Sequence, residues 1–133
     1  MFNQVIKYTD APARVAMSAI FLLSGVGKLS AYAQTQGYME AFGLPGGLLA
    51  PTIAFEIGAG LALLVGFQTR FVAFLLAGFS IATALVFHRD FGDQAQMIMF
   101  LKNVAIAGGF LVMAKAGAPG LSVDALLSAR KGR

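Results

Sequence analysis

The stretch GLLAPTIAFEIGAGLALLVGFQTRFVAFLLAGFSIATALVF, residues 47–87, decides the fold. It contains two apolar runs, and only Gln68 and Thr69 lie between them. A bilayer core of about 30 Å needs roughly 20 apolar helical residues. We therefore expect one transmembrane helix over about 47–67 and another over about 70–87. Because the link between them is so short, the two helices must form an antiparallel hairpin.

Two further apolar stretches of membrane length flank this hairpin, at about 11–29 and about 96–116. Pro12 and Pro51 suit the first turns of their helices, where a missing N–H is tolerated. The sequence therefore predicts a single all-α domain over residues 1–133. Its fold class is an integral membrane four-helix bundle, with a short cytoplasmic hairpin and a longer outer first loop.

Composition supports the membrane assignment and excludes several kinds of site. Hydrophobic residues make up 58% of the 133 residues and charged residues only 12%, whereas a soluble domain carries about 25% charged residues. The chain has no cysteine, which excludes thiolate metal sites and iron–sulfur clusters held by this chain alone. His88 is its one histidine, so one copy cannot hold a haem between two histidines. No metal site and no covalently held cofactor are expected.

The distribution of Lys and Arg predicts the orientation. Basic residues gather on the side that would hold both termini and the hairpin turn: Lys7, Arg14, Arg70, Lys115, Arg130, Lys131 and Arg133. The opposite side has only Arg89 in a loop, together with Lys28 and Lys102 within the predicted helices. The positive-inside rule therefore places both termini in the cytoplasm. In this setting the net charge of +4 is no sign of nucleic-acid binding. We expect residues 1–29 to be retained rather than cleaved as a signal peptide.

Ionisable and amide side chains within or at the ends of the apolar segments are the candidate site. They are Lys28, Glu56, His88, Lys102 and Asn103. At about 1.5 Å of rise per residue, the predicted topology puts all of them in the outer half of the bilayer. A lone charge at mid-membrane costs about 2.5–3.5 kcal/mol, so Glu56 should pair with Lys28, Lys102 or both.

Two lysines and one carboxylate would leave an excess positive charge in this layer. Such an excess would suit a quinone head group, an anionic lipid head group or a small oxyanion. Each of these residues also has an interpretation that involves no ligand. Lys28 can snorkel to the interface, and His88 can be a polar helix end. Asn103 can hydrogen-bond across helices, and the Glu56 pair can be purely structural.

Small residues recur every four positions in two of the predicted helices. These stripes are Ala54, Gly58, Ala62 and Gly66, and Ser80, Ala84 and His88. Small residues let helix backbones approach closely in a membrane. The stripes therefore indicate helix contacts, and they suit the interior of one bundle and a homo-oligomer equally.

Five short motifs occur in order along the chain. The first two are FLLSGVGKL at 21–29 and FGLP at 42–45. The third begins with Glu56, Gly58 and Gly60 and continues through LLVG at 63–66 to Thr69-Arg70. The fourth is His88, and the fifth runs from Lys102-Asn103 through Gly108-Gly109 to GAPGLSVD at 117–124. No single motif is specific, but the ordered set resembles the DoxX family over nearly the whole chain. The closing motif departs from the usual Gly-Pro-Gly run by the insertion of Ala118.

The resemblance implies a four-helix protein of the bacterial inner membrane. The family takes its name from a subunit of a terminal quinol oxidase system. Relatives are linked to thiosulfate:quinone oxidoreductase, to resistance against quinones and catechols, and to membrane complexes that handle oxidative stress. Many members have no assigned activity, and whether this chain is itself an enzyme is left open.

The first functional hypothesis is a quinone-linked redox accessory protein. Lys28 and Lys102 would contact a carbonyl or anion, Glu56 would hold the lysines, and His88 would relay protons. Electrons would come from a membrane or periplasmic partner protein or from a bound quinone. The alternative is a non-enzymatic subunit or assembly factor with a structural charge cluster. Transport of a small anion or a proton would need a water-filled path, and the predicted cytoplasmic half of the helices has few polar residues to line one.

Overall fold

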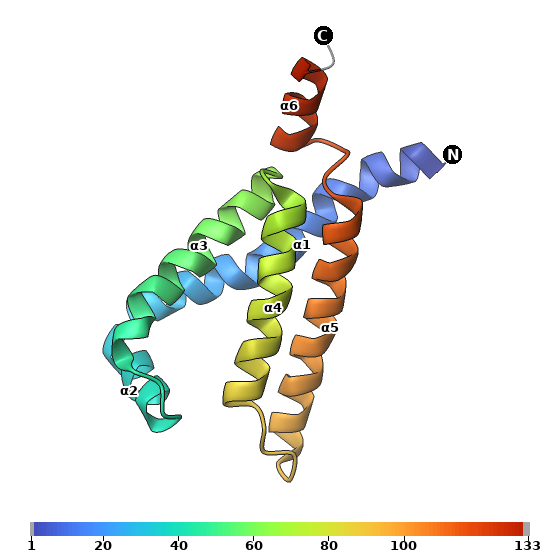
Figure 1. The fold of residues 1–133 in the computed structure, drawn as a ribbon. Helices are drawn as coiled ribbons and strands as arrows, with labels where there is room; N and C mark the ends of the chain where they lie inside the picture. Colours follow the sequence, from blue (N-terminus) through green and yellow to red (C-terminus); the bar gives the residue numbers. More distant parts are fainter. Residues whose placement is uncertain (1, 132–133) are drawn as a thin grey trace.

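The computed structural model describes residues 2–131 and consists of helices joined by short turns (Figure 1). In chain order the elements are α1 (Phe2–Ser30), α2 (Tyr32–Ala41), the 3-10 turn η1 (Gly46–Leu48), α3 (Leu49–Val65), α4 (Thr69–Phe87), α5 (Gln94–Ala116) and α6 (Val123–Lys131). Arg133 and the side chain of Lys7, both used above as topology markers, lie outside what it describes.

Four segments are long and apolar enough to cross a membrane. They are Tyr8–Ser30, Gly46–Val65, Thr69–Phe87 and Gln94–Ala116. Large apolar side chains such as Leu23, Phe74 and Val112 point outward and are more than half exposed, as expected for surfaces that face lipid. The predicted all-α fold with four transmembrane helices is confirmed.

The four long helices form two closely packed pairs. α1 packs along α3 and α4 along α5, whereas α3 and α4 make far fewer contacts with each other. Figure 1 shows α3 and α4 diverging from the turn that joins them, toward the end of the bundle where α2 lies. The pairs meet in a core that includes Phe21 and Phe110, whose ring centroids are 5.5 Å apart.

Glycines set how closely α1 and α3 approach. A Cβ atom on Gly25 would lie 2.6 Å from Cγ1 of Ile57, and one on Gly60 would lie 2.9 Å from Cδ2 of Leu22. In contrast, Ala54 and Gly58 of the predicted stripe are exposed, and a Cβ on Gly58 would meet open space. Those two positions therefore take no part in the α1–α3 contact. Spacing by four residues identifies a helix face but cannot say which neighbour covers it.

Two glycines of α1 give a matched test of this contact. Gly25→Ala should lower the free energy of unfolding by about 1–3 kcal/mol, because the new methyl group overpacks against Ile57. Gly27→Ala should be neutral or stabilising by up to about 1 kcal/mol, because its Cβ meets nothing within 4 Å and alanine favours a helix. Thermal unfolding in detergent, followed by circular dichroism, measures both. Equal effects of the two changes would contradict this account of the helix contact.

A buried arginine ties three segments together at the end of the bundle opposite α2. Arg14 is only 1% exposed. Its Nη1 donates to the carbonyls of Leu63, at 3.4 Å, and Leu64, at 2.8 Å, and its Nη2 donates to the carbonyl of Leu121. Asp10 lies 3.4 Å from Nη2. Arg14, which the sequence suggested only as a topology marker, thus joins α1, the end of α3 and the C-terminal segment.

The α3–α4 turn is closed by a side chain from far along the chain. Asp124 accepts hydrogen bonds from the backbone N–H groups of Gln68 and Thr69, both at 2.8 Å, and its own N–H donates to the Gly66 carbonyl at 2.8 Å. It therefore caps α4, which has no capping side chain of its own. Gly66 has φ +74, and a Cβ there would lie 2.4 Å from Ser122. We call Asp10, Arg14, Ser122 and Asp124 the terminal latch.

The terminal latch should weaken in acid through Asp124. Burial raises the pKa of this carboxyl, but the hydrogen bonds from Thr69 and Gln68 and the charge of Arg14 outweigh burial, so its pKa lies below the usual 3.8. A lowered folded-state pKa means that the stabilisation is complete well above pH 3.8 and disappears as the pH falls through the folded pKa. Asp124→Asn keeps one acceptor oxygen and loses the charge and the second acceptor, so we expect it to cost about 1 kcal/mol at pH 7.

The destabilisation by Asp124→Asn should shrink toward zero when the variant and the unmodified protein are unfolded below pH 3.8. A difference that stayed constant between pH 7 and the acid range would contradict the role assigned to the carboxylate.

Candidate functional site

A cavity of about 420 Å³ lies between the two helix pairs, with α2 beside it. Its walls are mostly apolar and include the rings of Phe21, Phe79 and Phe87. Phe21 and Phe79 are in ring contact, with centroids 6.1 Å apart. Ligand pockets in proteins commonly have volumes of about 300–1,000 Å³ and combine apolar walls with a few polar groups. This cavity has the size and lining of such a pocket.

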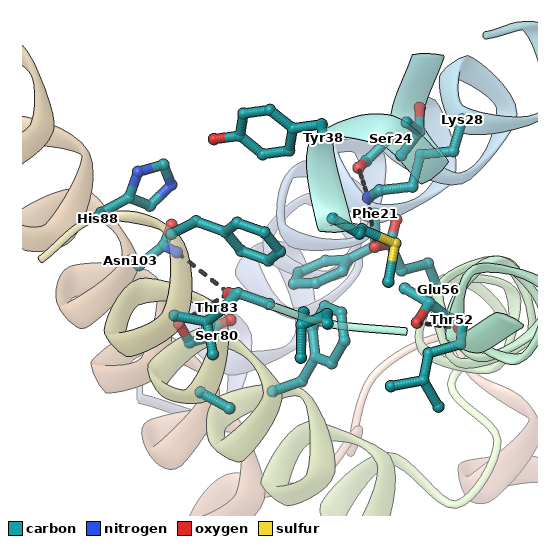
Figure 2. A pocket seen from close by; sticks show the side chains of 18 of the residues that line it. Phe21, Ser24, Lys28, Tyr38, Thr52, Glu56, Ser80, Thr83, His88 and Asn103 are labelled. Carbon is teal, nitrogen blue, oxygen red and sulfur yellow. Dashed lines mark hydrogen bonds and ion pairs between the residues drawn. The ribbon is translucent and has the colours of Figure 1, made fainter. Parts of the chain in front are cut away.

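One wall carries an ion pair between α1 and α3. Lys28 Nζ lies 2.5 Å from Glu56 Oε1 and donates to Ser24 Oγ at 2.8 Å. The predicted pairing of Glu56 is confirmed, and its partner is Lys28. Glu56 is only 2% exposed, and its second oxygen, Oε2, is buried without a hydrogen-bond partner. Figure 2 shows Ser24, Lys28 and Glu56 grouped together on this side of the pocket.

The opposite wall carries uncharged polar groups from α4 and α5. Asn103 Nδ2 donates to Thr83 Oγ1 at 3.2 Å, and Thr83 Oγ1 donates to the Ser80 carbonyl at 3.1 Å. Asn103 thus makes the bond between helices expected by the interpretation that involves no ligand. His88 lies at the end of α4, and its Nδ1 is 3.0 Å from Gln96 Oε1. Figure 2 shows His88, Asn103 and Thr83 across the pocket from Glu56.

Lys102 does not join the other four candidate residues. It is exposed, and it is not among the residues that line the cavity, whereas its neighbour Asn103 is. Adjacent residues of an α-helix point about 100° apart, and here Asn103 faces the cavity while Lys102 does not. The predicted layer with two lysines is corrected to one lysine and one carboxylate. Among the cavity-lining residues the formal charges of Lys28 and Glu56 cancel, which removes the expected positive excess.

Several lining side chains were not among the residues selected from the sequence. Tyr38 of α2 stacks on Phe87, with ring centroids 5.4 Å apart, and also contacts Phe42 at 4.9 Å. Ser24 could have been found, because it precedes Lys28 by four residues and so shares its helix face. Thr52 stands in the same relation to Glu56. Tyr38 carried no such signal, since its place depends on how α2 folds back over the helices.

Known proteins similar to this chain agree with the architecture. The DoxX family model matches residues 10–89. The chain belongs to the DoxX family. The match runs from within α1 to just past the end of α4. It includes Lys28, Glu56 and His88, while Asn103 lies beyond it. The Lys28–Glu56 pair is therefore within the part of the chain that the DoxX model describes.

Two inner membrane proteins of Escherichia coli K12 are similar over most of their length. Inner membrane protein YqjF is 47% identical over 116 residues, which cover 87% of this chain and 89% of YqjF. Inner membrane protein YphA is 37% identical over 119 residues, which cover 84% of this chain and 85% of YphA. No solved structure matches the chain. This DoxX-family chain is thus a membrane protein of the inner-membrane type.

Proposed function

We propose that the protein is a quinone-linked redox accessory protein that binds a quinone-type ring in the cavity between its helix pairs. One observation carries the proposal: an aromatic cavity of about 420 Å³ has an ion pair in one wall and hydrogen-bonding groups in the other. An apolar ring with oxygen atoms on opposite sides matches such walls. The family membership and the inner-membrane relatives are compatible with a lipid-soluble ligand of this kind.

The ligand would enter a site that is apolar where the ring lies and polar where its oxygens lie. Phe21, Phe79 and Phe87 supply the ring surfaces, and stacking or edge contacts between aromatic groups add to burial. Lys28 has three N–H donors, of which two meet Ser24 and Glu56. The third is free to reach a ligand oxygen. His88, which also lines the cavity, would relay protons under this proposal.

Under this proposal the electrons move between the bound ring and a membrane or periplasmic partner protein. The role proposed for this chain is to hold and orient the ring and to manage protons beside it.

A binding titration tests the proposal. The full chain, in lipid nanodiscs, is titrated with a decyl-substituted benzoquinone and its quinol, and bound ligand is measured by equilibrium dialysis. We expect saturable binding by at least one form. The variant Lys28→Met/Glu56→Gln, which removes both charges together, should weaken binding by about tenfold, as expected for the loss of one charged hydrogen bond.

Lys102→Met is the matched control, because Lys102 is exposed and outside the cavity. It should bind like the unmodified protein. Binding that the double variant leaves unchanged, or no saturable binding at all, would refute the proposal.

The alternative is a non-enzymatic membrane subunit whose charge pair is structural. It is favoured by the position of the Lys28–Glu56 pair, which joins α1 and α3, two helices that already pack closely. The same double variant separates the two. If it lowers only the yield or the melting temperature, while ligand binding per folded molecule is unchanged, the structural role is correct.

We also propose that both termini face the cytoplasm. Arg70 donates to the backbone carbonyls of Lys115 and Ala116 in α5. Arg130 and Lys131 lie near the same end of the bundle, while Arg89 lies at the opposite end. The positive-inside rule then gives the orientation. Reporter fusions at the C-terminus, one active only in the cytoplasm and one only in the periplasm, test it. Activity of the periplasmic reporter would overturn this orientation.

A further inference from the structure

The short helix α6 and the turn before it expose leucines outside the membrane-spanning segments. Leu121, in the turn, is 82% exposed, and Leu126 and Leu127 of the helix are 65% and 41% exposed. α6 follows the last segment that is long enough to cross a membrane, which ends at Ala116. Figure 1 shows α6 extending past the α3–α4 turn, away from the four long helices. These leucines would be left in water unless something covers them.

The two faces of α6 differ in chemistry. The face that lines the groove between α4, α5 and α6 has small or polar side chains: Asp124, Ala125, Ser128 and Ala129. At about 100° per residue, the opposite face holds four residues, all exposed: Leu126, Leu127, Arg130 and Lys131. We call these four residues the outer face of α6. Each leucine precedes a basic residue by four positions, so the apolar part of the outer face lies one turn nearer the bundle than the charged part.

This order matches the layers of a bilayer surface. Asp124, in the first turn of α6, accepts hydrogen bonds from the N–H groups of Gln68 and Thr69, so α6 begins level with one end of the membrane-spanning helix α4. At about 1.5 Å per residue, the leucines of the outer face lie no more than about 5 Å further out, and its basic residues about 9–11 Å. The head-group layer is about 5–8 Å thick on each side of the hydrocarbon core. The leucines therefore lie within this layer, and the long basic side chains can reach back to its phosphates.

The charges at this end of the bundle favour an anionic surface. The acidic groups Asp10 and Asp124 are engaged in the terminal latch, where Asp10 accepts from the Gly120 N–H at 3.1 Å and lies 3.4 Å from Arg14. The exposed charged side chains that the structure describes here are all basic: Arg70, Lys115, Arg130 and Lys131. A stable interface with another protein buries about 800 Å² on each partner, which is more than four side chains on one face of a nine-residue helix supply.

We propose that α6 docks on anionic phospholipids of the membrane that the protein spans. The leucines of its outer face would lie between lipid head groups, and Arg130 and Lys131 would contact lipid phosphates. Amphipathic helices bind membrane surfaces in this way, through apolar burial together with attraction to anionic lipids. Each basic residue near such a surface raises the ratio of docked to undocked helix about fivefold. Because Asp124 belongs to both α6 and the terminal latch, docking of α6 also holds the latch in place.

A fluorescent reporter in the outer face tests this proposal. The chain has no tryptophan, so Leu127→Trp in the full chain gives a signal from α6 alone. The protein is reconstituted in phosphatidylcholine vesicles with or without about one-third phosphatidylglycerol, an anionic lipid. Lipids brominated near the head group quench a tryptophan that touches them. We expect quenching to be about twofold or more stronger with phosphatidylglycerol, and we expect the difference to disappear in about 1 M salt, which screens charges beyond about 3 Å.

A charge variant identifies the groups responsible. In the reporter protein, Arg130→Gln/Lys131→Gln should lower the ratio of docked to undocked helix about 10- to 30-fold. Quenching with phosphatidylglycerol should then fall to the level seen without it. Arg89→Gln is the matched control, because Arg89 is exposed at the opposite end of the bundle, and it should leave quenching unchanged.

Two results would overturn the proposal. Equal quenching in the two lipid mixtures would mean that α6 does not select anionic lipids. A tryptophan that is shielded from water but not quenched by brominated lipids would mean that a protein surface, such as a second copy of the chain, covers α6 instead. The comparisons of lipid and salt need no charge variant, so the test stands even if Arg130→Gln/Lys131→Gln fails to fold.

Discussion

Replacement of Arg14 by methionine should lower the free energy of unfolding by about 3–5 kcal/mol, the cost of removing one partner from a buried charged network. The guanidinium is buried and donates to the carbonyls of Leu63, Leu64 and Leu121. Methionine fills a similar volume but donates nothing. Three carbonyl bonds and the contact with Asp10 would be lost together, and the C-terminal segment would be released from the bundle.

Thermal unfolding in detergent and limited proteolysis of the C-terminal segment measure this effect. Arg89→Met is the matched control, because Arg89 is an exposed arginine at the opposite end, and it should change stability by less than about 0.5 kcal/mol. If the segment after Ala116 is no more sensitive to protease in Arg14→Met than in the control, Arg14 does not hold it.

The single change Lys28→Met should be as damaging as the Arg14 change, at about 3–5 kcal/mol, because it leaves the charge of Glu56 buried without its partner. The double change Lys28→Met/Glu56→Gln should recover most of that loss. A neutral carboxamide costs much less to bury than an unpaired carboxylate. The gap between single and double variants measures how strongly this part of the bundle depends on charge balance.

Melting temperatures of the single variants, the double variant and the unmodified protein form a double-mutant cycle. A coupling energy close to zero would mean that Lys28 and Glu56 do not act as a pair in the membrane. That result would remove the basis for placing an ion pair in this wall of the cavity.

The sequence predicted much of the candidate site, and where the prediction differs from the structure the physical reason is clear. Glu56 was predicted to be paired because an isolated charge is costly in a bilayer, and it is paired with Lys28. The same argument could not choose between Lys28 and Lys102. Hydropathy places both lysines at similar depth, but depth does not tell which way a side chain points around its helix. Asn103 faces the cavity and Lys102 does not.

The terminal latch was not predicted at all. Arg14 and Asp124 are 110 positions apart in the printed sequence, and neither belongs to a local pattern that would reveal its contacts. Arg14 was interpreted through the positive-inside rule, which counts charges near helix ends and ignores whether they are solvated. Asp124 caps a helix that begins at Thr69, so no capping motif near that helix could reveal it.

The sequence by itself determined the membrane class and the number of transmembrane helices, because both depend on hydrophobic length, a property that adds up along the chain. It also determined that the buried carboxylate needs a cation. Only the tertiary structure decided which cation, which helix faces meet at Gly25 and Gly60, and where the cavity lies. These depend on the rotation and divergence of helices packed in pairs, which are set by contacts between residues far apart in the chain.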